Sequence, residues 1–221
     1  MAEGIGTAFL VAAVVGSGIA AARLSPDDVG LQLLENSLVT GAALVALILA
    51  LQPVSASFNP AVTLVERALG TITSGTAAAL VLAQVVGGLV GVVLANLMFE
   101  LDAVSFATQD RSGAGRWLAE AVATFGLVLV VFGALRTGRA YVVAVAVGGY
   151  ITAAYWFTSS TSFANPAVTI ARMFSDTFAG IAPSSAPAFL AFQAIGAAVG
   201  LVTVRFLFPS PQRQEPERSH P

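Results

Sequence analysis

The chain of 221 residues contains no cysteine, no lysine and only one histidine, His220, next to its C-terminus. Without cysteine it has neither a disulfide framework nor a thiolate metal site. A lone histidine at the end of the chain argues against histidine-dependent catalysis. Charged residues make up only 10% of the chain, and the net charge of −2 offers no basic surface for nucleic acid. We therefore expect that the protein is not an enzyme, and that it has no nucleic-acid partner, no metal and no other cofactor.

Hydrophobic residues, by contrast, make up 57% of the sequence. They are arranged in six stretches, each close to the roughly 20 residues that a bilayer requires. The first stretch lacks a basic region before it, so we interpret it as a span and not as a signal peptide. The Pro-rich, charged tail at 209–221 is expected to be disordered and cytoplasmic. The sequence predicts an all-α membrane protein with six transmembrane helices at about Gly4–Ala22, Leu31–Leu51, Gly75–Phe99, Trp117–Leu135, Tyr141–Phe157 and Ala186–Phe208.

The phrase Asn-Pro-Ala-Val-Thr occurs twice, at 59–63 and at 165–169. Asparagine accepts from the free N–H groups at a helix start, and proline fits the first helical turn. The helices predicted at Asn59–Leu69 and Asn165–Phe174 are too short to cross a bilayer. We interpret them as half-helices that enter the membrane and turn back. One copy alone could be a helix cap in a loop, but the pair favours a shared site.

Other features recur in the same order around the two phrases. Glu3 and Glu120 each stand four residues before a threonine, in the first and fourth spans. Gln84 and Gln193 each precede a pair of glycines, in the third and sixth spans. Because each half has three spans, the second half is inverted, and its half-helix enters from the opposite face. The sequence predicts one domain at 1–208, with repeat one at about 1–101 and repeat two at about 116–208.

With both phrases and these flanking motifs, the chain resembles the aquaporin (major intrinsic protein) family over residues 2–208. The resemblance implies an aquaporin-like fold, a homotetramer with one pore per subunit, and a passive channel for small neutral solutes in the bilayer of the cell membrane. Two helix N-termini that meet at the pore centre repel cations and protons. The residues implied at that centre are Asn59, Pro60, Ala61, Asn165, Pro166 and Ala167.

The same resemblance gives a role to the two glutamates. Glu120 matches the family's buried glutamate, which accepts hydrogen bonds from the re-entrant loop, and Glu3 is its counterpart in the first half. A carboxylate inside a membrane is costly enough to need such partners. Glu3 alone could instead be an interfacial charge at a helix end. The four glycines Gly87, Gly91, Gly196 and Gly200 are expected at helix-packing contacts.

The position after the second Asn-Pro-Ala differs from the family pattern. Most members have arginine there, at the narrowest part of the pore, whereas this chain has Val168. The next arginine, Arg172, lies one turn further along the half-helix and is expected to point to the outer mouth. The alternatives are that it reaches back and restores the missing charge at the filter, or that it forms a surface pair with Asp176. The resemblance implies a selectivity filter formed with Val168 by Thr40, by Ala153 or Ala154, and by Ser162 or Phe163.

A filter with threonine, alanine and valine is wide and carries little charge. The second phrase and its surroundings are similar to aquaglyceroporin-like members associated with bacterial arsenic resistance. We expect passage of glycerol-like polyols and of metalloid hydroxides such as arsenite, As(OH)₃, with water as a further candidate solute. A water-selective aquaporin is one alternative. A secondary transporter, which should carry a mid-span carboxylate for a coupling ion, is another, and a structural membrane protein with a closed pore is a third.

Arginine distribution indicates an orientation with both termini in the cytoplasm. The expected inner segments contain six arginines and the outer segments four, in the direction of the positive-inside rule. The inner set is Arg67, Arg136, Arg139, Arg205, Arg213 and Arg218, and the outer set is Arg23, Arg111, Arg116 and Arg172.

Overall fold

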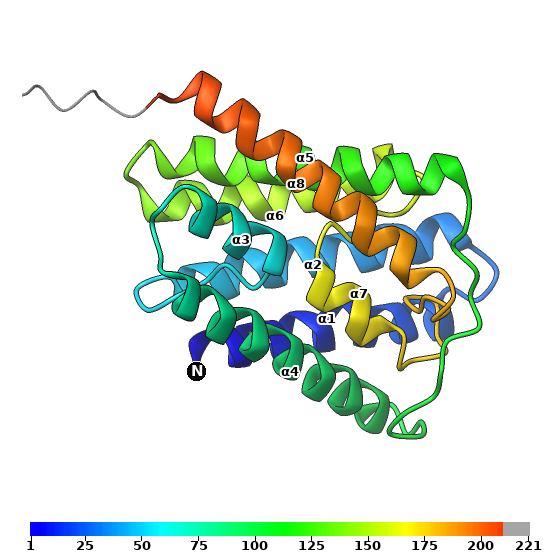
Figure 1. Cartoon of the computed structure of the whole chain (residues 1–221). Helices are drawn as coiled ribbons and strands as arrows, with labels where there is room; N and C mark the ends of the chain where they lie inside the picture. The colour runs from blue at the N-terminus through cyan, green and yellow to red at the C-terminus, as the bar shows by residue number, and fades with distance from the viewer. Residues whose placement is uncertain (210–221) are drawn as a thin grey trace, which may run out of the picture.

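The computed structural model describes residues 1–209, which form eight α-helices without any β-strand (Figure 1). Six helices are long and apolar enough to cross a membrane, and two are short. The prediction of an all-α protein with six spans and two half-helices is confirmed, with small shifts at the helix ends. The expected disorder of the tail lies outside the described residues. The helices are α1 (Ala2–Leu24), α2 (Val29–Leu51), α3 (Pro60–Ala68), α4 (Ser74–Met98), α5 (Ala114–Leu135), α6 (Ala140–Phe157), α7 (Pro166–Arg172) and α8 (Ala186–Leu207).

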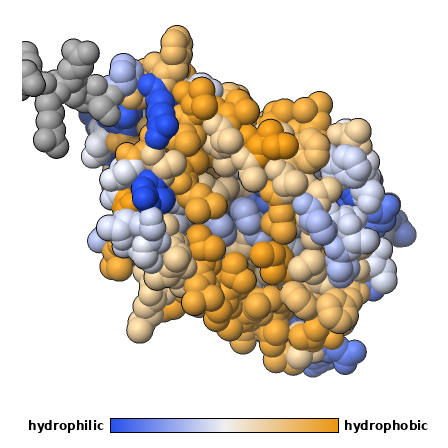
Figure 2. Space-filling view, in the orientation of Figure 1, coloured by the Kyte–Doolittle hydropathy of each residue, from blue (hydrophilic) through white to orange (hydrophobic). Residues whose placement is uncertain are grey.

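The two short helices occupy the middle of the molecule. In Figure 1, α3 and α7 extend toward opposite ends of the bundle and lie between α8 above and α4 below. The N-terminus and the end of α8 lie on the same side, as an even number of crossings requires. Figure 2 shows a broad hydrophobic band over this face, with hydrophilic residues gathered at both ends. This surface matches a bilayer core flanked by water.

Glycines let the third span of each half touch the first at backbone distance. A Cβ added at Gly87 of α4 would collide with the carbonyl oxygen of Gly4 in α1. In the second half, a Cβ at Gly196 of α8 would collide with the carbonyl oxygen of Ala121 in α5. A Cβ at Gly91 would likewise collide with the carbonyl oxygen of Ala8, and a Cβ at Gly200 would meet the side chain of Val128. The predicted packing role of these glycines is confirmed, and it follows the small-residue rule for membrane helices.

At the helix ends, two arginines also connect the first span of each half to the third span. Arg23, at the end of α1, donates over 2.7 Å to the carbonyl of Phe99, which ends α4. Arg136, at the end of α5, donates over 3.1 Å to the carbonyl of Phe208, which ends α8. Each guanidinium also lies over the ring of the same phenylalanine. A cation at a helix C-terminus stabilises the unpaired carbonyls there.

Candidate functional site

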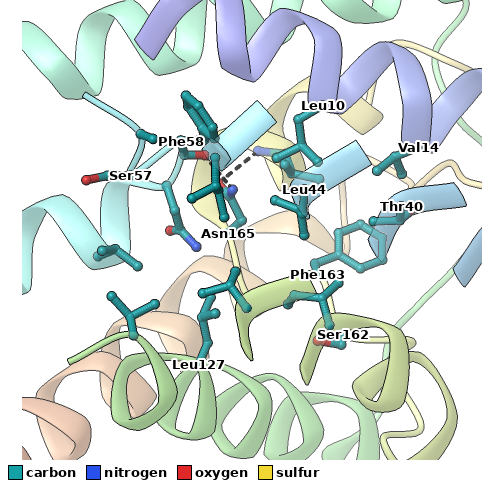
Figure 3. A pocket seen from close by; sticks show the side chains of 18 of the residues that line it. Leu10, Val14, Thr40, Leu44, Ser57, Phe58, Leu127, Ser162, Phe163 and Asn165 are labelled. Carbon is teal, nitrogen blue, oxygen red and sulfur yellow. Dashed lines mark hydrogen bonds between the residues drawn. The ribbon is translucent and has the colours of Figure 1, made fainter. Parts of the chain in front are cut away.

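The two half-helices begin face to face, each at an asparagine. The Asn59 Oδ1 atom accepts from the N–H of Ala61 at 2.9 Å, and the Asn165 Oδ1 atom accepts from the N–H of Ala167 at 3.0 Å. Each side-chain amide then crosses to the other half. Asn59 Nδ2 donates to the carbonyl of Ala164 at 2.8 Å, and Asn165 Nδ2 donates to that of Phe58 at 2.7 Å (Figure 3). The asparagines therefore cap their own helices and join the halves.

The residue before each asparagine has a left-handed backbone. Phe58 has a φ of 48° and Ala164 a φ of 47°. For a residue with a side chain this conformation costs about 1–2 kcal/mol. The N–H of Phe58 donates to Glu3 Oε2 at 2.7 Å, and the N–H of Ala164 donates to Glu120 Oε2 at 3.0 Å. Charge-assisted hydrogen bonds to a buried carboxylate offset the strain in each loop.

Each carboxylate is also tied to its half-helix through a glutamine. Gln84 Nε2 donates to Glu3 at 2.6 Å and to the Thr63 hydroxyl of α3 at 2.9 Å. Gln193 repeats the arrangement, with donation to Glu120 at 2.6 Å and to Thr169 of α7 at 2.8 Å. Glu3 is only 1% exposed, so its interpretation as an interfacial charge is wrong. The first and third spans of each half thus hold the loop before the half-helix.

We predict that Glu120→Gln weakens the fold and spares permeation. The Glu120 carboxylate accepts from the N–H groups of Phe163 and Ala164 and from Gln193. In Glu120→Gln, the side-chain NH₂ group would face another N–H donor at one of these contacts. This mismatch should lower the free energy of unfolding by about 1–3 kcal/mol. Thermal stability in detergent should fall, whereas flux per folded protein in vesicles should stay similar.

The matched control for this prediction is Glu35→Gln. Within residues 1–209, the Glu35 carboxylate accepts one hydrogen bond, from the Ser25 hydroxyl at 2.9 Å. It should lose less stability than Glu120→Gln. Loss of all flux in a well-folded Glu120→Gln protein would show that the carboxylate takes part in permeation itself.

Between the halves lies a cavity of about 70 Å³ with a mainly aliphatic wall. Four spans contribute to it at intervals of about one turn, and α4 and α8 contribute no residue. The polar residues in its lining are Thr40, Ser57, Asn59, Tyr155, Ser162, Asn165 and Arg172. No acidic residue lines it in the part of the chain that the structure describes. The aliphatic side chains of the four spans are Leu10, Val14, Leu44, Ile48, Leu127, Val131, Val143, Val147 and Ile151.

The position predicted for α6 in the filter has to be corrected. Neither Ala153 nor Ala154 lines the cavity: Ala153 is exposed on the outside of the bundle, and Ala154 is buried away from the lumen. Tyr155 lies there instead, and its hydroxyl is 3.2 Å from that of Thr40 on α2. Tyr155 continues the fourth-residue spacing that runs through Ile151, and this spacing could have identified it.

The other predicted filter residues all reach the cavity. Thr40, Ser162, Phe163 and Val168 are among its lining residues, so the structure does not separate Ser162 from Phe163. Ser162 is 3% exposed, and its buried hydroxyl oxygen has no hydrogen-bond partner in residues 1–209. Figure 3 places Thr40, Ser162 and Phe163 at one end of the cavity and Ser57 at the other. We call these the Arg172 end and the Ser57 end.

Arg172 lines the same cavity as Val168, so the expectation that it points out to the mouth is wrong. It is only 2% exposed, and the centre of its guanidinium lies 3.4 Å from the centroid of the Phe163 ring. Its Nε atom donates to the carbonyl of Ala179. The surface pair with Asp176 is also wrong, because α7 ends at Arg172 and Asp176 accepts instead from Thr108.

A second arginine near this end was not predicted. Arg111, in the loop before α5, is 7% exposed and lies 5.1 Å from the Phe163 ring. It donates to the carbonyls of Gly180 and Phe178 at 2.7 and 3.1 Å. Burial, together with the positive charge of Arg172, lowers the pKa of Arg111 to about 9. This is still above neutral pH, so two positive charges flank the Phe163 ring.

Comparison with known proteins identifies this arrangement. The model of the family described as "Major intrinsic protein" matches residues 1–142. Over 208 residues the chain is 50% identical to aquaglyceroporin AqpS of Rhizobium meliloti (strain 1021), with coverage of 94% of this chain and 88% of that protein. The chain belongs to the major intrinsic protein family. The X-ray structure of the aquaglyceroporin from Plasmodium falciparum shares its fold, with a TM-score of 0.69 at 19% identity, over 94% of this chain and 93% of that one.

As a member of the major intrinsic protein family, the chain is a channel for small neutral solutes and is not an enzyme. The prediction of an aquaporin-like fold and of a channel is confirmed. The secondary-transporter alternative required a carboxylate in mid-span, and the described lining of the cavity contains none. The family match also explains why the wall is aliphatic: a solute that finds few partners does not linger.

Proposed function

We propose that this channel conducts glycerol-like polyols and metalloid hydroxides such as As(OH)₃ down their concentration gradients. The observation that carries the proposal is the division of the cavity wall into an aliphatic part and a few polar groups. A polyol can lay its carbon skeleton on the aliphatic part and direct its hydroxyls to Asn59, Asn165 and Arg172.

The position of the guanidinium supports passage of solutes larger than water. Val168 occupies the place where the resemblance to the family implies arginine, and it adds no charge and little bulk. Arg172 lies one turn further, where it packs against the Phe163 ring and its Nε atom donates to the carbonyl of Ala179, so its guanidinium is held away from the Val168 position. The relatives reported above are both named aquaglyceroporins, which favours polyols among the neutral solutes.

The paired asparagines serve in this proposal as the centre of the pore. Each Nδ2 atom has one hydrogen engaged with a carbonyl of the other half. Its second hydrogen can be donated to a passing oxygen. The facing helix starts add positive potential, which repels cations at this point. Glu3 and Glu120 act as braces for the loops and not as proton carriers.

We further propose that the protein lies in the cell membrane as a homotetramer with both termini in the cytoplasm. The arginine bias of six to four supports this orientation. It places the Arg172 end of the pore outside and the Ser57 end inside. The family resemblance supports the tetramer, with one pore in each subunit.

Stopped-flow measurements on the purified protein in vesicles test the solute class. Water, glycerol, urea and arsenite would each be applied as a gradient, without a proton or sodium gradient. We expect fast, non-saturating flux of glycerol and arsenite that exceeds the flux of empty vesicles. Water flux with no glycerol or arsenite flux would favour the water-selective alternative. Saturable, ion-dependent flux would contradict a channel, and no flux of any solute would favour a closed structural protein.

A further inference from the structure

The half-helix α3 carries a carboxylate, Glu66, one turn beyond the residues with which it lines the cavity. Asn59 starts this helix, and Val62, three residues later, also lines the cavity. Glu66 follows seven residues after Asn59, so it continues the same face by about one turn. Glu66 is half-buried. Its backbone is fixed because its carbonyl accepts from the N–H and the hydroxyl of Thr71, at 3.1 and 2.8 Å.

The other half-helix shows what this position can do. Asn165, Val168 and Arg172 have the same spacing on α7, and all three line the cavity. Arg172 is therefore the counterpart of Glu66 in the inverted repeat. The two ends of the pore carry opposite charges at equivalent places. One end offers hydrogen-bond donors, and the other offers acceptors.

Ser57 connects the carboxylate to the lumen. The Ser57 hydroxyl donates to Glu66 Oε2 at 3.0 Å, and Ser57 lines the cavity at the end opposite Thr40 and Ser162 (Figure 3). Because its proton is committed to Glu66, the hydroxyl turns its lone pairs to the lumen and acts there as an acceptor. Phe163 stands at the equivalent position, two residues before its asparagine, and contacts Arg172 through its ring and not through a hydrogen bond.

We propose that Ser57 and Glu66 form an acceptor site for solute hydroxyl groups, and that this site, with Arg172 at the other end, sets the solute class. The proposal rests on the proposed function of polyol and metalloid hydroxide passage. A solute that enters the pore gives up hydrogen bonds to water, and each loss raises its barrier unless the wall replaces it. Solutes with several O–H donors gain most from an acceptor at this point.

The experiment compares Ser57→Ala and Glu66→Leu with the wild-type channel, with glycerol and water as probes. Loss of one hydrogen bond in the pore should lower glycerol permeability per assembled channel by about five-fold. Water permeability should change by less than half as much, because water is small and keeps other water molecules as neighbours in the single file through the pore. Glu66→Gln keeps an acceptor for the serine proton and should retain most of the glycerol flux.

Ser55→Ala is the matched control. Its hydroxyl donates to Glu3 Oε1 at 2.5 Å from the same loop, but Ser55 is not among the cavity-lining residues. It should lower stability without a change in the ratio of glycerol to water flux. A proportional fall of both fluxes in Ser57→Ala, or an unchanged ratio in both test variants, would overturn the acceptor site. If wild-type vesicles pass no glycerol, the proposed function fails first, and a normal wild-type flux with unchanged variant ratios refutes only the acceptor site.

Discussion

Replacement of Val168 with arginine should lower glycerol permeability by at least about ten-fold, the effect of about 1.4 kcal/mol on the barrier. Val168 is 5% exposed and lines a cavity of about 70 Å³, so the longer side chain has to extend into the lumen. It would also add a second guanidinium on the same helix face as Arg172, from a Cβ atom about 5–6 Å away, one helical turn apart. Because the two guanidinium groups repel each other, they cannot both pack against the wall of the pore.

Water permeability should fall less, because a water file needs a narrower passage than a polyol. Stopped-flow measurement of both solutes on the same vesicles gives the ratio directly. Val168→Leu is the matched control, since it adds bulk without charge and should lower glycerol flux only moderately. An unchanged ratio of glycerol to water flux in Val168→Arg would exclude this position from the filter, and the argument on solute class would fail with it.

Replacement of Arg172 with leucine should admit cations. The buried guanidinium is a fixed positive charge in the lining of the pore, close to the path of every solute. At a separation of 4 Å and an effective dielectric constant of 20, one unit charge repels another by about 4 kcal/mol. Loss of even a fraction of this repulsion should raise the potassium leak of proteoliposomes by at least about ten-fold.

The control for this change is Arg116→Leu. Arg116 is also a cation at this end of the molecule, but it is exposed and donates to the carbonyls of Asp110 and Ser112. It should leave the leak unchanged. The double variant Val168→Arg with Arg172→Leu moves the charge one turn along α7 and should restore cation exclusion while it lowers glycerol flux. A tight Arg172→Leu channel would show that the facing helix starts exclude cations without this arginine.

Sequence patterns predicted the elements of the fold because membrane spans have a length that the bilayer imposes. The short helices were equally visible, since Asn-Pro at a helix start has a local physical cause that Asn59 and Asn165 display. The contacts between elements were less visible. Gln84 and Gln193 were recognised as repeated residues, but their bonds to the carboxylates and to the half-helices depend on side chains distant in the sequence.

The filter shows where sequence reasoning failed. Transfer of a position from the family to α6 depended on a one-residue gap, and each helical residue turns the side chain by about 100 degrees. A shift of one residue in the transferred position therefore selected Ala154 in place of Tyr155, which lines the cavity. Arg111 could not be found at all, because it lies in a loop and reaches Phe163 across separate segments. Arg172 was misplaced because its partners, Phe163 and Ala179, come together only in the folded chain.

The crossed asparagine amides also order the events of folding. Asn59 bonds to a carbonyl 105 residues later, and Asn165 to one 107 residues earlier. Half of each contact is therefore missing while only the first three spans have been synthesised. Contacts of such long range form late, since the intervening chain has to be ordered first. We expect the first half to enter the bilayer before its re-entrant loop has reached its final conformation. The pore should acquire its final shape only when the second loop enters from the opposite face.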